Sequence, residues 1–270
     1  MIGDQQIWNR IRSRKLTLIA GPCVIESRSL CWTIARRLKK ICADFDVNYV
    51  FKASYDKANR TSGKSYRGPG AEAGLDVLEG VRDYFEVPVT TDVHTGEQAI
   101  ECGGRIDILQ IPAFLCRQTD LIAAAVSTGK IVNVKKGQFL SPQEMGQVVA
   151  KAREMGGEKL LLTERGTTFG YNNLISDMRS IPIMKEFGCP VVFDATHSVQ
   201  QPGGGGDRTV GQREFAPLLA RCAVAAGAEA VFVETHPDPD DAMSDGPNMV
   251  PLNEMRALVK SLVKIKAAVA

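Results

Sequence analysis

The sequence has no run of apolar residues that approaches the roughly 18 needed for a membrane-spanning helix. Residues 1–15 carry charges but no apolar segment followed by a cleavage site, so we expect no signal peptide. No charge dominates either: Lys and Arg number 33, Asp and Glu number 31, and the net charge is +2. We therefore expect neither nucleic acid nor a membrane surface as a partner, and any anion-binding site must be local.

The cysteines show no CxxC pair and no regular spacing. Their number is seven, and an odd set scattered through apolar sequence is typical of reduced thiols in the cytosol. We therefore expect a cytoplasmic protein in which most cysteines are small core residues. Cys23 differs from the others because it follows Gly21-Pro22 at the end of a β-forming run.

Several common catalytic motifs are also missing. The sequence contains no nucleophile elbow, no catalytic triad and no HExxH. Gly63-Lys64-Ser65 resembles the end of a phosphate-binding P-loop, but Ala58 stands where that motif requires its first glycine. Because no strand-to-helix turn surrounds this segment, we reject the P-loop interpretation.

Short β-forming runs alternate along the chain with longer segments of helical periodicity. Eight such units in about 250 residues predict a (β/α)₈ TIM barrel, an α/β fold, as a single domain over residues 1–270 with residues 1–15 as an N-terminal extension. The predicted strands are Leu16–Ala20, Tyr49–Ala53, Pro88–Thr91, Ile106–Gln110, Ile131–Val134, Leu160–Thr163, Pro190–Phe193 and Ala230–Val233. The predicted helices include Ser29–Ala43, Glu72–Phe85, Asp120–Ser127, Pro142–Glu154, Leu174–Lys185, Gln212–Ala226 and Leu252–Val269.

A doubly wound open sheet is the main alternative fold. If such a sheet bound a dinucleotide, a GxGxxG turn would follow its first strand, and Gly21-Pro22-Cys23 is not that turn. Two segments are predicted to be mobile active-site loops, because each follows a strand that carries a candidate ligand. They are the glycine-rich segment Gln201–Asp207 and the Pro- and Asp-rich segment Pro237–Asn248.

Four metal-binding residue types lie at predicted strand ends or in the loops that follow. Parallel α/β folds place their active sites at that edge. A thiolate, an imidazole and two carboxylates form a suitable ligand set for a divalent transition metal. Without a local spacing such as HExxH, the alternative of a hydrogen-bonded structural histidine stays open. The candidate metal ligands are Cys23, His197, Glu234 and Asp245.

A second group of residues is cationic. Surface lysines are usually solvated, but lysines directly after apolar strand residues would lie at the barrel mouth and converge on an anionic substrate. The set consists of Lys52, Lys57, Arg60, Lys135, Lys136 and Arg165. Asp92 and His94, past the end of another strand, could transfer protons, bind substrate hydroxyls or have a structural role.

Six segments carry a resemblance to a known family. The chain resembles 3-deoxy-D-manno-octulosonate 8-phosphate synthases from about Leu16 to its C-terminus. The segments are residues 21–27 (GPCVIES), 51–62 (FKASYDKANRTS), 107–114 (DILQIPAF), 132–139 (VNVKKGQF), 163–166 (TERG) and 194–197 (DATH).

The resemblance implies a (β/α)₈ barrel, a homotetramer and an enzyme of lipopolysaccharide biosynthesis. This enzyme would condense phosphoenolpyruvate with D-arabinose 5-phosphate and water. One alternative is the sibling heptulosonate 7-phosphate synthase, which uses erythrose 4-phosphate and typically has Lys-Pro-Arg where this chain has Lys57-Ala58-Asn59-Arg60. Another alternative is a barrel that binds sugar phosphates without catalysis. The presence of both a complete set of metal ligands and a complete set of phosphoenolpyruvate-binding residues disfavours it.

The resemblance also implies residue roles. Lys52, Lys57, Lys135 and Arg165 would hold phosphoenolpyruvate, with Gln138 and Ala113 nearby. Arg60 and Thr61 would bind the sugar phosphate, joined by Arg117 from a neighbouring subunit, and Ser54, Asn59, Asp92 and Gln110 would line the sugar. Family members more often have serine at the position of Thr61. Cysteine in the first motif marks the metal-dependent class, so Cys23, His197, Glu234 and Asp245 would bind Fe, Mn, Zn or Co, and His197 and Asp245 would also act in catalysis.

Overall fold

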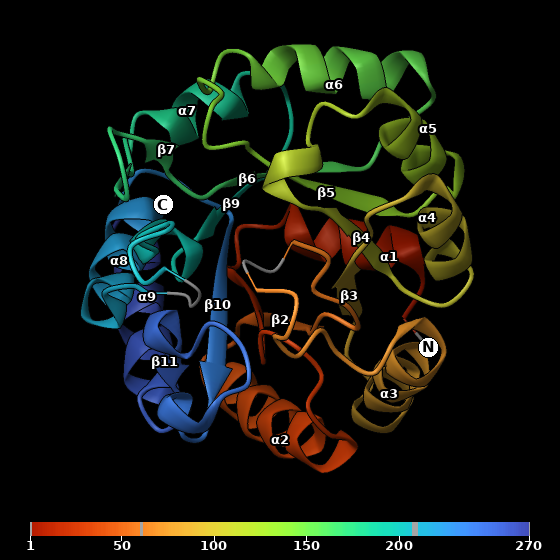
Figure 1. Ribbon diagram of the computed structural model, residues 1–270. Helices are drawn as coiled ribbons and strands as arrows, with labels where there is room; N and C mark the ends of the chain where they lie inside the picture. The colour runs from red at the N-terminus through yellow and green to blue at the C-terminus, as the bar shows by residue number, and fades with distance from the viewer. Residues whose placement is uncertain (1, 60–61, 207–209, 270) are drawn as a thin grey trace.

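The computed structural model describes residues 2–59, 62–206 and 210–269. Eight parallel strands form a closed barrel, and helices surround it (Figure 1). Strand β1 pairs with both β2 and β10, and the register Gly21↔Glu234 joins the first strand to the last. The strands are β1 (Thr17–Gly21), β2 (Asn48–Lys52), β3 (Val89–Asp92), β4 (Ile108–Ile111), β5 (Ile131–Lys135), β6 (Leu160–Glu164), β9 (Val191–Asp194) and β10 (Ala230–His236). The closed sheet confirms the TIM barrel and excludes the open doubly wound sheet.

Side chains alternate between the barrel interior and the helices, as the two-residue period of a strand requires. One buried cluster fills the interior and includes Ile19, Val50 and Phe232. A larger buried cluster packs the outer faces of the strands against the helices. The helices are α2 (Arg28–Asp44), α3 (Ala71–Phe85), α4 (Gly96–Gly103), α5 (Thr119–Ser127), α6 (Met145–Glu154), α7 (Ser180–Lys185), α8 (Ala216–Ala225) and α9 (Met255–Ala268).

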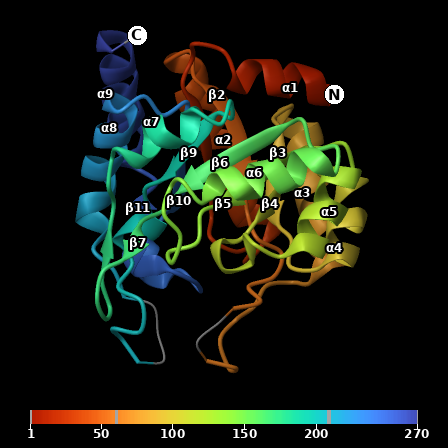
Figure 2. The same ribbon diagram turned by 90° about the horizontal axis from the view of Figure 1, so that it is seen from above.

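The N-terminal extension contains helix α1 (Asp4–Ile11), which the sequence prediction missed. Its residues Ile7, Trp8 and Ile11 are buried against the interior cluster. Lys130, which directly precedes β5, pairs with Asp4 at 3.1 Å, so α1 covers the N-terminal end of the barrel. Figure 2 shows α1 at one end of the barrel and the long loops extending from the other. The open end is therefore the one where the strands terminate.

Four predicted helices need correction. Helix α9 begins at Met255 rather than Leu252. The segment predicted as a helix from Leu174 forms strand β8 (Leu174–Ile175), which pairs with β7 (Thr167–Thr168), and helix α7 begins only at Ser180. Helix α6 begins at Met145 rather than Pro142, and a reciprocal pair of bonds between Ser141 and Glu144 closes the turn that precedes it. Helix α8 begins at Ala216, after a 3₁₀ turn at Arg213–Phe215.

Helix α4 was also missed, and six of the eight barrel strands end one residue beyond the predicted end. The largest difference is in β10, which continues to His236, so Glu234 lies within this strand rather than at its end. Strand β11 (Val250–Pro251) pairs with this extension. Among the described residues, no helix is long and apolar enough to cross a membrane.

Candidate active site

A cavity of about 220 Å³ opens at the carboxyl ends of the strands. Most of the predicted site residues line it: Lys52, Lys57, Asn59, Asp92, His94, Gln110, Ala113, Lys135, Gln138, Arg165, His197 and Asp245. The glycine-rich loop contributes Gln201, Pro202 and Gly203, and Asp245 comes from the second predicted loop. Parallel strands that end at one edge thus bring together residues that are far apart in the sequence.

Five of the predicted residues do not line this cavity in the described structure, and one of them is Lys136, which is wholly buried. Ser54, Cys23 and Glu234 are buried beside it and contact its lining. Arg117 is exposed and lies in a separate hollow with α6 residues, away from the cavity of its own chain. Arg60 and Thr61, predicted to bind a sugar phosphate, lie outside the described residues.

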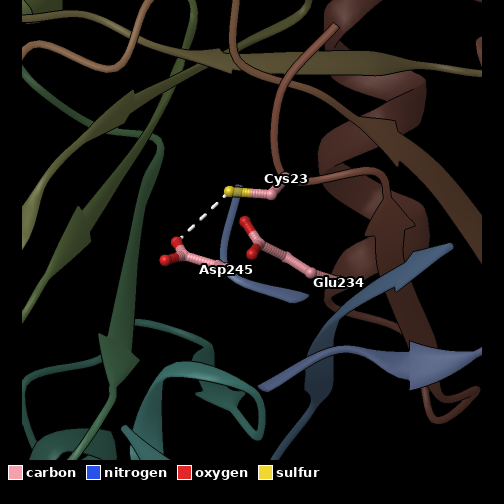
Figure 3. Close-up of side chains that lie close together, drawn as sticks. All are labelled: Cys23, Glu234 and Asp245. Carbon is pink, nitrogen blue, oxygen red and sulfur yellow. Dashed lines mark hydrogen bonds between the residues drawn. The ribbon is translucent and has the colours of Figure 1, made fainter. Parts of the chain in front are cut away.

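Cys23, Glu234 and Asp245 form a compact cluster (Figure 3), in which one ligand atom of each lies within 4.8 Å of the others. The Cys23 Sγ atom lies 3.3 Å from Asp245 Oδ2 and 2.9 Å from Ser244 Oγ. Gly21 permits this arrangement, since a Cβ there would lie 2.0 Å from the Lys52 carbonyl oxygen. Asp245 adopts a left-handed conformation with φ of 52°.

His197 stands next to this cluster, in a 3₁₀ turn (His197–Val199) just after β9. Its Nε2 atom lies 3.7 Å from Glu234 Oε2 and 3.8 Å from Asp245 Oδ2. Glu234 Oε2 is buried and has no hydrogen-bond partner among the described residues. A buried oxygen of this kind beside a thiol, an imidazole and a second carboxylate fits a bound cation.

The cluster's electrostatics agree with that fit. Burial raises the pKa of the Cys23 thiol well above its ordinary value, and the Asp245 and Glu234 carboxylates raise it further. Burial also acts to raise the pKa of Glu234, but His197, Lys52 and Lys57 outweigh it and lower this pKa to about 2. The protein alone therefore holds a thiol beside carboxylates, and a divalent cation would favour the thiolate.

Four cations surround the cavity and are almost fully buried, with exposed fractions of 1% for Lys52, 8% for Lys57, 6% for Lys135 and 4% for Arg165. Lys52 Nζ donates to Glu234 Oε1 at 3.1 Å and to Ser54 Oγ at 2.9 Å. Lys135 Nζ donates to Asp194 Oδ2 at 2.7 Å and lies 4.1 Å from the centre of the Phe232 ring. Buried cations at this density suit an anionic ligand.

Lys136 does not belong to this group, contrary to the prediction. It is wholly buried, and its Nζ donates to the carbonyl oxygens of Gly137 and Leu140 and to Thr167 Oγ1 at 2.9 Å. Strand alternation explains the difference, because Lys135 faces the cavity and its neighbour must face away. Lys136 therefore holds the loops after β5 and β6 together.

Two polar groups that line the cavity have unmet hydrogen-bonding capacity. Arg165 Nη2 donates to Gln200 Oε1 at 2.6 Å, whereas Arg165 Nη1 and Gln138 Oε1 are buried without partners among the described residues. Buried polar atoms are normally paired. These two are positioned to contact a ligand.

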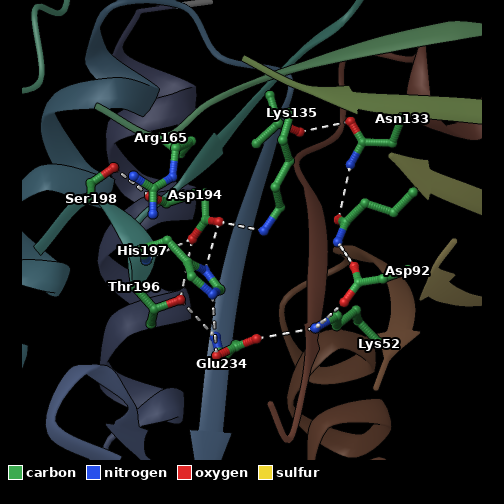
Figure 4. A network of polar contacts seen from close by, with 12 residues as sticks. Lys52, Asp92, Asn133, Lys135, Arg165, Asp194, Thr196, His197, Ser198 and Glu234 are labelled. Carbon is green, nitrogen blue, oxygen red and sulfur yellow. Dashed lines mark hydrogen bonds and ion pairs between the residues drawn. The ribbon is translucent and has the colours of Figure 1, made fainter. Parts of the chain in front are cut away.

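A hydrogen-bonded chain crosses the strands beneath the cavity (Figure 4). Thr163 Oγ1 donates to Asn133 Oδ1 at 2.6 Å, and Asn133 Nδ2 donates to Gln110 Oε1 at 3.3 Å. Gln110 and Ser54 then both donate to the Asp92 carboxylate. The chain fixes the orientation of the Gln110 amide and keeps Asp92 an acceptor.

Sequence reasoning gave no role to four residues that the structure places at the site: Asn133, Asp194, Gln200 and Ser244. Two of them had a usable signal. Asn133 precedes Lys135 by two positions and so shares its face of the strand. Asp194 directly ends a β-forming run. His94 lines the cavity and contacts Gln98 of α4, with Nδ1 3.2 Å from Gln98 Oε1.

Comparisons with known proteins show the family to which the chain belongs. A model of the DAHP synthetase I family matches residues 9–270. The 2-dehydro-3-deoxyphosphooctonate aldolase of Rhodopseudomonas palustris is 58% identical over 253 residues, which are 93% of this chain and 88% of the relative. The enzyme of the same name from Azoarcus sp. is 58% identical over 250 residues, 92% of this chain and 90% of that relative. The one from Synechococcus sp. is 56% identical over 255 residues, 94% and 90% of the two chains. The family resemblance of the six motifs is confirmed: the chain belongs to the DAHP synthetase I family and, within it, to the 2-dehydro-3-deoxyphosphooctonate aldolases, which are transferases.

Proposed function

We propose that this enzyme condenses phosphoenolpyruvate with D-arabinose 5-phosphate and water, giving 3-deoxy-D-manno-octulosonate 8-phosphate and phosphate for lipopolysaccharide biosynthesis. The observation that carries this proposal is the meeting of two sets of residues at one cavity. Four buried cations lie beside the cluster of Cys23, Glu234 and Asp245. The names of the relatives support the product.

The cations would bind phosphoenolpyruvate. Lys52, Lys135 and Arg165 would hold its phosphate and carboxylate, with Lys57 at the same wall of the cavity. Arg165 Nη1 and Gln138 Oε1 support this placement, since both are buried and lack partners among the described residues. Ala113, which is small and buried, would leave room for the ligand.

Polar residues that adjoin these cations would bind the aldose, since Ser54 and Asp92 contact Lys52. Ser54, Asn59, Asp92 and Gln110 offer hydroxyl, amide and carboxylate groups to its hydroxyls, and Arg60 and Thr61 would take its phosphate. The pair Ala58-Asn59 stands where a heptulosonate-type enzyme typically has proline, and Asn59 supplies an extra hydrogen-bonding amide for a longer sugar. This substitution favours arabinose 5-phosphate over erythrose 4-phosphate.

In the proposed reaction, the methylene carbon of phosphoenolpyruvate attacks the aldehyde carbon, and water adds to the carbon that bears the phosphate ester. The hemiketal phosphate then loses phosphate by carbon–oxygen cleavage. The cations stabilise the charge that develops at the phosphate and carboxylate, and the cavity orients the two carbon atoms. A divalent Fe, Mn, Zn or Co ion held by Cys23, His197, Glu234 and Asp245 would polarise an oxygen of the aldehyde or of water.

The deciding experiment measures phosphate release from phosphoenolpyruvate with each aldose. The specificity constant with arabinose 5-phosphate should greatly exceed that with erythrose 4-phosphate. Comparable constants would favour the heptulosonate alternative. Binding of both ligands without phosphate release, in protein of verified metal content, would favour a non-catalytic barrel.

We also propose a homotetramer in which Arg117 serves a neighbouring cavity. Its exposure and its place in a hollow separate from the cavity of its own chain support this. Arg117→Ala protein that still assembles should lose affinity for the sugar phosphate. Hybrid oligomers with Lys135→Ala protein should regain activity, because some cavities then have both residues. Verified hybrids without any recovery would rule out the shared site.

A further inference from the structure

Asp194 ends β9 and is wholly buried. Its Oδ2 atom accepts a hydrogen bond from Lys135 Nζ at 2.7 Å and lies 2.8 Å from His197 Nδ1 (Figure 4). Lys135 is one of the cations around the cavity, and His197 is a candidate metal ligand. A single carboxylate oxygen thus touches both halves of the site.

The second oxygen of Asp194 fixes the turn that carries His197. Asp194 Oδ1 accepts from the His197 backbone N–H at 2.9 Å and from Thr196 Oγ1 at 3.2 Å. Thr196 Oγ1 in turn accepts from the backbone N–H of Glu234 at 3.2 Å. The position of His197 relative to Glu234 therefore depends on Asp194.

We propose that Asp194 is a positioning residue that couples the phosphoenolpyruvate and metal subsites by holding Lys135 and His197 on one carboxylate. This inference rests on the proposed function for the identity of the two ligands. A carboxylate only accepts hydrogen bonds, so the ring proton lies on Nδ1 and Nε2 keeps its lone pair toward Glu234 and Asp245. Asp194 Oδ2 lies 2.8 Å from Nδ1, which has no other hydrogen-bond partner among the described residues.

Asp194→Asn keeps the shape of the side chain but changes what it offers. An amide can donate to the ring nitrogen, which favours the tautomer with its proton on Nε2, where it blocks ligation. Lys135 would lose its charged partner and its fixed place over Phe232. The affinities for the metal ion and for phosphoenolpyruvate should therefore both fall, although Asp194 would contact neither ligand.

The test measures binding, not turnover. Chelator-treated protein is titrated with Co(II), whose absorption reports ligation by the Cys23 sulfur, and separately with phosphoenolpyruvate by calorimetry. Asp194→Asn should weaken Co(II) binding by about 10- to 100-fold and phosphoenolpyruvate binding by about fivefold or more. The matched control is Asp107→Asn, another buried carboxylate, which accepts from Val89 N at 2.8 Å at the opposite end of the barrel and should change neither.

Double-mutant cycles separate positioning from a general structural effect. In a His197→Ala background, Asp194→Asn should change Co(II) affinity by less than about twofold, and in a Lys135→Met background it should change phosphoenolpyruvate affinity equally little. If Asp194→Asn lowers the affinity in either background as much as it does in the parent protein, the proposal is overturned. Unchanged Co(II) affinity or tighter phosphoenolpyruvate binding in Asp194→Asn itself would also overturn it.

If Asp194→Asn does not fold, Asp194→Glu provides the same measurements, since it keeps the charge but displaces both oxygens by one methylene. Asp194→Glu should also weaken the binding of both Co(II) and phosphoenolpyruvate. If it binds both as tightly as the parent protein, the proposal is overturned. Failure of the proposed function is distinguishable. A parent protein that binds Co(II) and phosphoenolpyruvate but releases no phosphate with arabinose 5-phosphate contradicts the function, while the cycles still decide the role of Asp194. A parent that binds neither ligand overturns both.

Discussion

Lys52 and Glu234 form a buried ion pair, with Nζ 3.1 Å from Oε1 and both residues 1% exposed. Removing one partner would leave a buried charge with fewer compensating groups. Lys52→Met and Glu234→Gln should each lower the free energy of unfolding by about 3 kcal/mol or more, and the double variant should lose less than the sum. Urea unfolding of the metal-free proteins measures this. The control is the exposed pair Lys15–Asp46, whose removal should have little effect. If the double variant loses the sum of the two single losses in unfolding free energy, Lys52 and Glu234 are not energetically coupled.

Asp92 gives the stability of the protein a predictable pH dependence. Burial acts to raise the pKa of its carboxyl, but Lys52, Lys57 and Lys135 outweigh it and hold this pKa well below the ordinary value of 3.8. A depressed folded-state pKa contributes stability that is present above the ordinary value and is lost as the pH falls below it. The unfolding free energies of the parent and Asp92→Asn should therefore differ most near neutral pH and converge below about pH 4. A difference that widens on acidification would show that the pKa is raised.

Asn133 should act on the sugar site through Gln110. Asn133→Ala removes a donor to Gln110 Oε1 and an acceptor for Thr163 Oγ1, and leaving such buried groups unpaired costs about 1–3 kcal/mol each. The Gln110 amide then loses its fixed orientation toward Asp92. We expect the KM for the aldose to rise more than the KM for phosphoenolpyruvate. Thr163→Val, which leaves the Asn133–Gln110 bond intact, should have a smaller effect, and equal rises in both KM values would argue for general loosening.

The order of the barrel strands was predictable because its β-forming runs are short, apolar and regularly spaced. Helix α4 was not, since its glycines weaken helix propensity and its formation depends on packing against α5 and on the burial of Ala99 and Cys102. The segment from Leu174 has apolar residues at helical spacing, yet its first residues pair with Thr167 and Thr168. Tertiary contacts overrode the local pattern in both cases.

For the site, the sequence indicated which strand ends carry chemistry but not which way each side chain points. Lys135 and Lys136 were both candidates, and only the two-residue alternation of β5, seen once the strand is placed, separates them. Asp194 was overlooked although it ends a β-forming run, because its proposed role depends on partners 59 residues before it and 3 residues after it, which only the closed barrel brings together. Paired contacts of this kind leave no local sequence pattern.

Metal removal tests the proposed role of the Cys23 cluster. Exhaustive chelation should abolish turnover, and Mn(II) or Fe(II) should restore it, because the cluster supplies a thiol, two carboxylates and an adjacent imidazole. His197→Ala and Asp245→Ala should weaken metal binding by roughly 10-fold or more. Cys222→Ser on helix α8, which lies outside the cluster, should bind metal like the parent.

Cys23→Asn is the sharper variant, because it places the residue of the metal-free class in the first motif. Asparagine has no thiolate, so this variant should lose the sulfur-to-cobalt absorption and most of its metal affinity. If the metal mainly fixes the geometry of the cavity, Cys23→Asn should keep some activity in the presence of chelator, which the parent should not. Full activity of parent enzyme that is verified to contain no metal would contradict the assignment of a required metal site to Cys23, His197, Glu234 and Asp245.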